Sequence, residues 1–164
     1  MLSVFILSAA RPGPLEATMR ALVPAAAEGH VADVHVVCDM PEPIARMADA
    51  MGAGVVEPNA AQDAMSECRG EWVLILEEGA CPTGDWVTAV SSHMLSKREP
   101  ARFRTESTRS FWQALFGRAK RPLASGLLIE TKTARANLHG DDWAGLARGR
   151  AVVTLPATLA PANL

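Results

Sequence analysis

Short apolar runs alternate with segments of helical periodicity through the first half of the chain. Residues 2–7 and 72–76 are almost wholly apolar and are bounded by turn residues, a pattern typical of strands buried on both faces. Residues 31–37 predict another strand, and residues 55–56 a short one. Strands that alternate with helices predict an α/β fold of three layers, α/β/α, around a mostly parallel sheet.

Proline, glycine and capping residues set the expected boundaries of the other elements. In the first half we expect a helix that begins at Pro14 and that Pro24 either ends or bends. We expect three more helices, over residues 43–51, from a cap at Asn59 to Gly70, and from Thr83 or Asp85 to residue 96. In the less regular second half we expect strands at 101–104, 127–130 and 151–155. We also expect helical pieces at 110–117, from the end of the second of these strands to about residue 137, and at 142–148. Residues 1–156 are expected to form one domain, followed by a flexible tail at 157–164.

Composition narrows the class of protein. A chain of 164 residues, 49% of them hydrophobic, suits one globular domain. The net charge of −2 gives no electrostatic reason to expect a nucleic-acid partner. Three widely spaced cysteines match neither a zinc pattern nor a disulfide framework, which favours a reducing compartment. No segment approaches the roughly 20 apolar residues needed to span a bilayer, so we expect a cytoplasmic protein.

Charged residues stand where predicted strands stop. Glu77 and Glu78 directly follow the run at 72–76, and Arg11 follows the run at 2–7. Open α/β sheets bind ligands at the carboxyl ends of their strands, where carboxylates can hold a cation or a sugar hydroxyl. Arg11 suits a phosphate there, although an ordinary solvated arginine explains it as well.

Five stretches carry a family resemblance, and they occur in a fixed order: LSVFILSAARPGPLEATMRALVP, ADVHVVCD, MADAMGAGVV, CRGEWVLILEEG and GDDWAGLARGRAVVTLP. Together they resemble the inverting, GT-A-type family 2 glycosyltransferases, especially the short bacterial members. The resemblance covers residues 1–86 and, more loosely, 123–156.

The resemblance implies a nucleotide-diphospho-sugar transferase fold. It implies a hexosyltransferase-type enzyme that moves a sugar from a nucleotide-sugar to an envelope or polysaccharide acceptor. Asp39, with Arg11 and Ser8, would contact the nucleotide. Glu77 and Glu78 would hold a divalent metal, Mn²⁺ or Mg²⁺, at the departing diphosphate.

A later acidic pair, Asp141 and Asp142, precedes Trp143 at the start of a predicted helix. In the family, an acid at this place is the general base that acts on the acceptor hydroxyl. The resemblance assigns that role to Asp142, with Asp141 as the second candidate. Helix capping alone also explains an aspartate at this position.

The chain departs from the family pattern at several places. Cys38 occupies the usual position of the nucleotide-binding aspartate, so that Asp39 lies one residue later. Gly79 stands where the main metal-binding aspartate is expected, and residues 40–43 replace a glycine- and serine-rich loop. These departures favour an alternative, a catalytically inactive GT-A-like module that binds a nucleotide or a protein.

An aromatic segment and four scattered histidines lead to the remaining predictions. Four large apolar side chains with basic flanks, Phe111, Trp112, Leu115 and Phe116, suit either a helix packed on the sheet or a segment at the inner membrane that presents a lipid-linked acceptor. A partner subunit is a second way to complete an acceptor site in so short a chain. The histidines His30, His35, His93 and His139 show no ligand spacing and predict core or surface roles.

Overall fold

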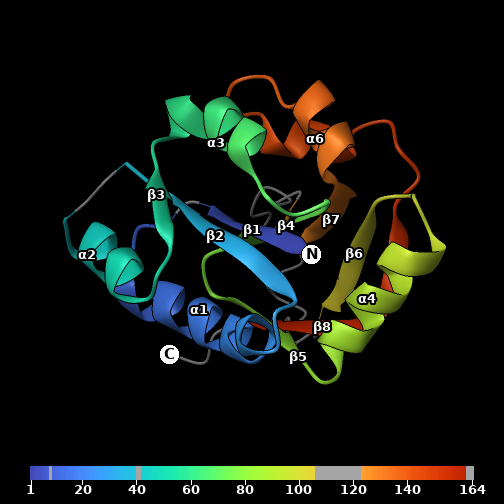
Figure 1. Ribbon diagram of the computed structural model, residues 1–164, viewed down its shortest axis with the longest axis horizontal. Coiled ribbons are helices and arrows are strands. Elements are labelled where there is room, and N and C mark those ends of the chain that lie inside the picture. The colour runs from blue at the N-terminus through green and yellow to red at the C-terminus, as the bar shows by residue number, and fades with distance from the viewer. Residues whose placement is uncertain (8, 40–41, 106–122, 162–164) are drawn as a thin grey trace, which may run out of the picture.

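The computed structural model describes residues 1–7, 9–39, 42–105 and 123–161 (Figure 1). Strands and helices alternate along the first half, as the hydrophobic pattern predicts. The elements in chain order are β1 (Leu2–Leu7), α1 (Pro12–Ala27), β2 (Val31–Val37), α2 (Glu42–Ala50), β3 (Gly54–Val56), η1 (Pro58–Ala60), α3 (Ala61–Glu67), β4 (Trp72–Glu77), β5 (Ala80–Thr83), α4 (Trp86–Ser96), β6 (Ala101–Thr105), β7 (Leu127–Glu130), α6 (Thr131–Asn137), η2 (Trp143–Ala147) and β8 (Val153–Pro161).

The strands form one sheet in the order β3-β2-β1-β4-β7-β6-β8-β5. Strands β1, β2, β3 and β4 are mutually parallel, and β6 and β8 are parallel to each other. β7 runs antiparallel to both β4 and β6, and β5 runs antiparallel to β8. All strands except β7 and β5 therefore point the same way, which makes the sheet mostly parallel.

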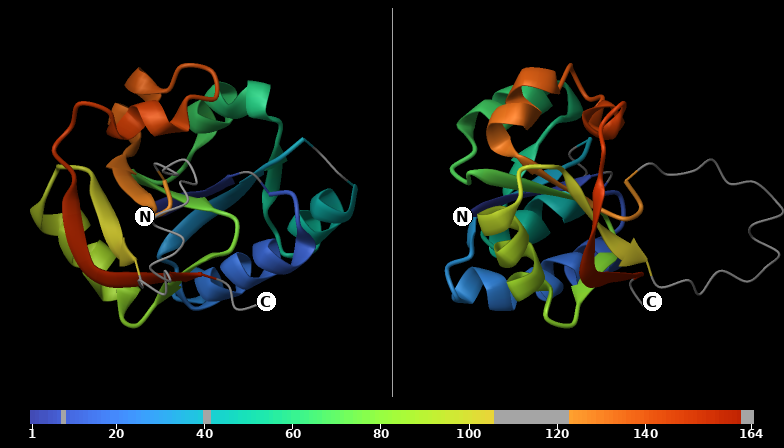
Figure 2. Two further views of the ribbon diagram at one scale, coloured as in Figure 1. Left: turned by 180° about the vertical axis from the view of Figure 1, so that it is seen from behind. Right: turned by 90° about the vertical axis from the view of Figure 1, so that its right-hand side faces the viewer.

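Helices cover both faces of the sheet and bury two separate cores (Figures 1 and 2). Apolar residues of α1, α2 and α4 pack on one face, against Val4, Leu74 and Leu76. Apolar residues of α3, α6 and η2 pack on the other face, against Phe5 and Ile75. Alternate residues of one strand thus serve opposite cores, as the strand repeat requires. The predicted three-layer α/β fold is confirmed.

The structure decides between the two predicted effects of Pro24 and corrects one predicted cap. Pro24 does not end helix α1, which continues to Ala27, because a proline removes only its own N–H and later turns can still close. The N–H of Glu28 bonds the carbonyl of Pro24 at 3.0 Å. Asn59 does not cap α3, since it lies inside η1 and the N-cap of α3 is Ala60. Asp85 does cap α4, accepting from the N–H of Thr88 at 3.4 Å.

The last strand extends further than expected. Residues 157–161 were predicted to form a flexible tail, yet they belong to β8 and pair with β5 from Thr83↔Thr158 to Ala80↔Pro161. β5 is an edge strand, where a proline such as Pro82 is tolerated because one side of the strand needs no donors. The predicted domain boundary at 156 therefore falls within a strand.

Several predictions concern residues outside the described ranges: Ser8, the helix expected at 110–117 with its aromatic and basic residues between 109 and 121, and the last residues of the expected tail, 162–164. No helix among the described residues is both long and apolar enough to cross a bilayer.

Candidate functional site

Three adjacent parallel strands end together at one edge of the sheet. Leu7, the last residue of β1, lies opposite Glu77, the last residue of β4. The N–H of Ala9 bonds the carbonyl of Val37 on β2 at 3.3 Å, and the N–H of Glu78 bonds the carbonyl of Leu7 at 3.1 Å. The loops that follow β1, β2 and β4 are thus joined by the backbone itself. We call this region the carboxyl edge of β1, β2 and β4.

Glu78 is bound to the loop after β1. One oxygen of its carboxylate accepts from the backbone N–H groups of Ala10, at 2.7 Å, and Arg11, at 3.0 Å. The other oxygen accepts from Nε of Arg11 at 3.2 Å. The Glu78 side chain is only 10% exposed, whereas that of Arg11 is 66% exposed. The Glu78 carboxylate therefore positions the β1–α1 loop, and most of the Arg11 guanidinium still faces solvent.

Gly79 turns the chain away from the edge. Its φ of +80° lies in the left-handed region, which costs glycine little and most other residues considerably more. Its N–H donates to the hydroxyl of Thr18 on α1 at 2.8 Å. This contact ties the β4–β5 turn to the first helix. The backbone conformation at position 79 therefore favours glycine over the aspartate of the family pattern.

Asp39 and Glu77 also lie at the carboxyl edge of β1, β2 and β4. Asp39 directly follows the buried pair Val37 and Cys38, and it is exposed. Glu77 is half-buried as the last residue of β4. The structure therefore places these two predicted residues, together with Arg11 and Glu78, on three neighbouring strand ends.

Asp142 lies on the face of the sheet that α3 and α6 cover. It caps η2, its Oδ1 accepting from the N–H of Gly145 at 3.0 Å. Its Oδ2 lies 3.4 Å from Nη1 of Arg148, and its side chain is 47% exposed. The neighbouring Trp143 is buried against Phe5 of β1, with ring centroids 4.9 Å apart. Capping is therefore a real role of Asp142, and Asp141 beside it is exposed.

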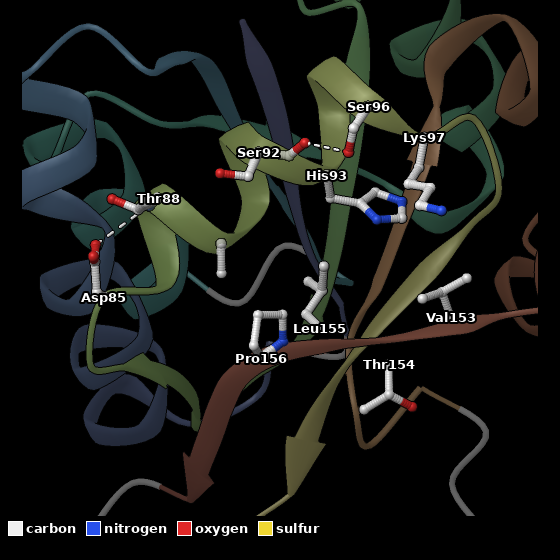
Figure 3. Close-up of a pocket in the computed structure, with 11 residues that line it drawn as sticks. Asp85, Thr88, Ser92, His93, Ser96, Lys97, Val153, Thr154, Leu155 and Pro156 are labelled. Atoms are coloured by element: carbon white, nitrogen blue, oxygen red, sulfur yellow. Dashed lines mark hydrogen bonds between the residues drawn. The ribbon is translucent and has the colours of Figure 1, made fainter.

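A cavity of about 420 Å³ lies elsewhere, between α4 and the last strand (Figure 3). One side of it is lined by Ser92 and His93 of α4 and by Lys97 directly after the helix, and the other side by residues 153–156 of the last strand. None of the predicted site residues within the described ranges borders this cavity. We therefore assign the ligand edge from the strand ends and their charges rather than from cavity size.

One polar cluster has no signal in the sequence pattern. Asp33 and His35 of β2 lie close to Cys68 at the end of α3, although Cys68 is distant from both in the sequence. Only tertiary structure brings Cys68 to the two β2 side chains. All three cysteines are free thiols, and burial raises the pKa of Cys81, which does not suit a nucleophile at neutral pH.

Comparisons with known proteins match this arrangement to solved glycosyltransferase structures. Glucosyl-3-phosphoglycerate synthase from Mycobacterium tuberculosis, in complex with Mn²⁺, UDP and phosphoglyceric acid, aligns with a TM-score of 0.66 at 14% identity, covering 100% of this chain and 71% of that one. A mannosyltransferase from Pyrobaculum calidifontis, in complex with GDP-Man and Mn²⁺, aligns with a TM-score of 0.66 at 16% identity, covering 98% and 56%. Mannosyl-3-phosphoglycerate synthase from Rubrobacter xylanophilus aligns with a TM-score of 0.57 at 15% identity, covering 100% and 66%.

No family model matches the chain, and no curated protein matches it. Because these neighbours are only 14–16% identical to the chain, the alignments show a shared fold and nothing beyond it. The strand order, the mostly parallel sheet and these alignments agree, and the chain has the GT-A-type, nucleotide-diphospho-sugar transferase fold.

Proposed function

We propose that the chain is a glycosyltransferase that moves a hexose from a nucleoside-diphosphate sugar to an acceptor hydroxyl, as in the short bacterial family 2 enzymes that its sequence resembles. One observation carries the proposal. The predicted charged residues Arg11, Asp39 and Glu77 lie in the loops after β1 and β2 and at the end of β4, at one edge of a GT-A-type sheet. Ligands of open α/β sheets bind at this edge.

In the proposed complex, Asp39 accepts hydrogen bonds from the nucleoside, and Arg11 meets the diphosphate. The solvent-facing guanidinium of Arg11 suits that role because Glu78 engages only its Nε. A guanidinium presents several N–H donors in a fixed plane, so its remaining groups can still bind a phosphate. Glu78 then acts through Arg11 and the loop, as a positioning residue.

A divalent cation at this edge would have fewer protein ligands than the family pattern provides. Glu78 is held by the β1–α1 loop, and Gly79 has no side chain, which leaves Glu77 as the first candidate ligand. Mg²⁺ commonly binds through one or two carboxylates together with substrate phosphates. The cation would neutralise charge on the departing diphosphate. Structures of the neighbours from M. tuberculosis and P. calidifontis contain Mn²⁺, which supports Mn²⁺ as the first probe.

Asp142 is the proposed general base. Its capping bond uses Oδ1, whereas Oδ2 lies toward Arg148 and solvent. In this role the carboxylate takes the proton of the acceptor hydroxyl while the oxygen attacks the anomeric carbon. Asp141 is the second candidate for the general base if Asp142 only caps η2.

The acceptor proposed from the resemblance is an envelope or polysaccharide hydroxyl. Phosphoglycerate is the acceptor probe that the solved neighbours supply.

The test is turnover of UDP-glucose and GDP-mannose with Mn²⁺, followed as release of the nucleoside diphosphate with and without phosphoglycerate or an oligosaccharide acceptor. Asp142→Asn should lower kcat by about 10²–10⁴-fold, the range of general-base catalysis, and leave nucleotide affinity unchanged. Asp141→Asn is the matched control. Wild-type protein that neither binds a nucleotide nor releases one with any donor would refute the proposal.

The second candidate is an inactive nucleotide- or protein-binding module. The engagement of Glu78 by the β1–α1 loop and the absence of an acid at position 79 favour it. Nucleotide binding that is independent of Mn²⁺, with no turnover in wild type or Asp142→Asn, would support this module over the enzyme.

A further inference from the structure

A second polar cluster lies on the face of the sheet covered by α3 and α6. Asp33 and His35 are alternate residues of β2, so both side chains leave the same face. Cys68 is the C-cap residue of α3 and is buried beside them. One carboxylate oxygen, one imidazole nitrogen and the sulfur all lie within 4.8 Å of one another. We call these three residues the β2–α3 cluster.

The β2–α3 cluster is separate from the carboxyl edge. Asp33 pairs with Ser3 and His35 pairs with Phe5, whereas Glu77 pairs with Leu7 at the end of β1. Two to four residues of extended strand span about 7–13 Å. A ligand in the cluster would therefore not touch the proposed nucleotide site.

Two atoms of the cluster are buried without a hydrogen-bond partner among the described residues. They are Oδ1 of Asp33 and Nε2 of His35, and they lie 3.4 Å apart. Buried polar atoms almost always have partners, so such a pair calls for an explanation. A neutral imidazole nitrogen and a carboxylate oxygen both present lone pairs, and a cation between them satisfies both.

The rest of the cluster is held in place. Oδ2 of Asp33 accepts from the backbone N–H of Arg69 at 3.0 Å and from its Nε at 3.2 Å. The Ser3 side chain also hydrogen-bonds with this carboxylate. Burial acts to raise the pKa of Asp33, but Ser3 and Arg69 help to bring it below its ordinary value. Among the described residues, Oδ1 is left as the oxygen without a partner. The guanidinium of Arg135 donates to the carbonyl of Cys68 at 2.8 Å, which anchors the end of α3. The Cys68 thiol donates to the carbonyl of Ala64 at 3.5 Å, a long contact that a metal bond can replace.

We propose that Asp33, His35 and Cys68 form a zinc site that fastens β2 to the turn between α3 and β4. One carboxylate oxygen, one imidazole nitrogen and one thiolate are ligands that Zn²⁺ prefers. Bonds of about 2.0–2.3 Å in a tetrahedron place ligand atoms about 3.3–3.8 Å apart. The cluster reaches that geometry by closing its longest separation by about 1 Å. A water occupies the fourth position.

Binding requires the thiolate. Burial raises the pKa of Cys68 to about 11, so the thiol keeps its proton at neutral pH in the metal-free protein. When the sulfur–zinc bond forms, the sulfur–hydrogen bond breaks and one proton passes to solvent. Zinc affinity should therefore increase with pH, and the metal-free thiol should react slowly with electrophiles.

The test uses Co²⁺ as a spectroscopic substitute for Zn²⁺ in the metal-free 164-residue chain, without nucleotide. One equivalent of Co²⁺ should produce a sulfur-to-cobalt charge-transfer band and the visible bands of a tetrahedral site, and Zn²⁺ should remove both. Cys68→Ser and His35→Gln should abolish the charge-transfer band. Cys81→Ser, at a half-buried thiol outside the cluster, is the matched control and should keep it.

Folding of each variant is checked by circular dichroism. X-ray absorption of zinc-loaded wild type is the independent measurement, since it needs no variant, and it should report one sulfur among nitrogen and oxygen neighbours. The proposal is overturned if wild type gives no charge-transfer band, if the band survives Cys68→Ser in folded protein, or if zinc has no sulfur neighbour. None of these readouts depends on glycosyltransferase activity.

Discussion

Replacing Glu78 by alanine should destabilise the folded protein by about 2–3 kcal/mol. The substitution removes three hydrogen bonds to a carboxylate that is 90% shielded, two from backbone N–H groups and one from Arg11. A hydrogen bond to a charged group contributes about 1.5–3 kcal/mol, and a pair with an exposed arginine about 0–1 kcal/mol. Ala10 and Arg11 are exposed, so water replaces part of the loss.

The measurement is urea unfolding followed by tryptophan fluorescence, since Trp72, Trp86 and Trp143 are buried. The expected loss lowers Tm by about 4–12 °C in a domain of this size. Arg11→Ala should cost less than about 1 kcal/mol, because the backbone bonds to Glu78 remain. Glu42→Ala removes an exposed carboxylate paired with Arg46 and is the matched control, expected within about 0.5 kcal/mol of wild type.

A metal-ligand role for Glu78 predicts a different result. Metal-free Glu78→Ala would then be as stable as wild type, and only the stabilisation by Mn²⁺ with nucleotide would be lost. Equal stabilities in metal-free buffer would therefore refute the loop-positioning role.

Three further perturbations test other parts of the structure. Gly145→Ala places a Cβ 2.5 Å from Oδ2 of Asp142, so it should displace that carboxylate and lower kcat in the nucleotide-release assay while Asp142 remains present. Gly70→Ala drives a Cβ into the backbone of Ser3 and should cost about 2 kcal/mol or more in urea unfolding, whereas Gly29→Ala, with open space but a φ of +76°, should cost less. Burial alone would raise the pKa of Glu130, but hydrogen bonds from Arg98 and Lys132 outweigh it and lower that pKa. This stabilisation is complete above the ordinary value of 4.5 and is lost as the pH falls below it, so Glu130→Gln should show a flatter decline of stability in acid.

Local sequence signals predicted the candidate site only in part. The ends of β1, β2 and β4 were predictable, because buried parallel strands are apolar and stop abruptly at polar residues. The engagement of Glu78 was not predictable, since its partners lie 67 and 68 residues away along the chain. The β2–α3 cluster was missed for the same reason, because motif spacing detects only ligands that are close in sequence.

The sequence by itself determined the alternation of strands and helices, and hence the three-layer class, since periodicity along the chain records which faces are buried. Tertiary structure alone decided that residues 158–161 pair with β5, an interaction between segments more than 70 residues apart. It also decided that Glu78 binds the loop after β1 and that Cys68 meets Asp33 and His35. The physical reason is that the chemistry of a side chain depends on its neighbours in space. Those neighbours are determined by how strands pair and how helices and loops pack on the sheet.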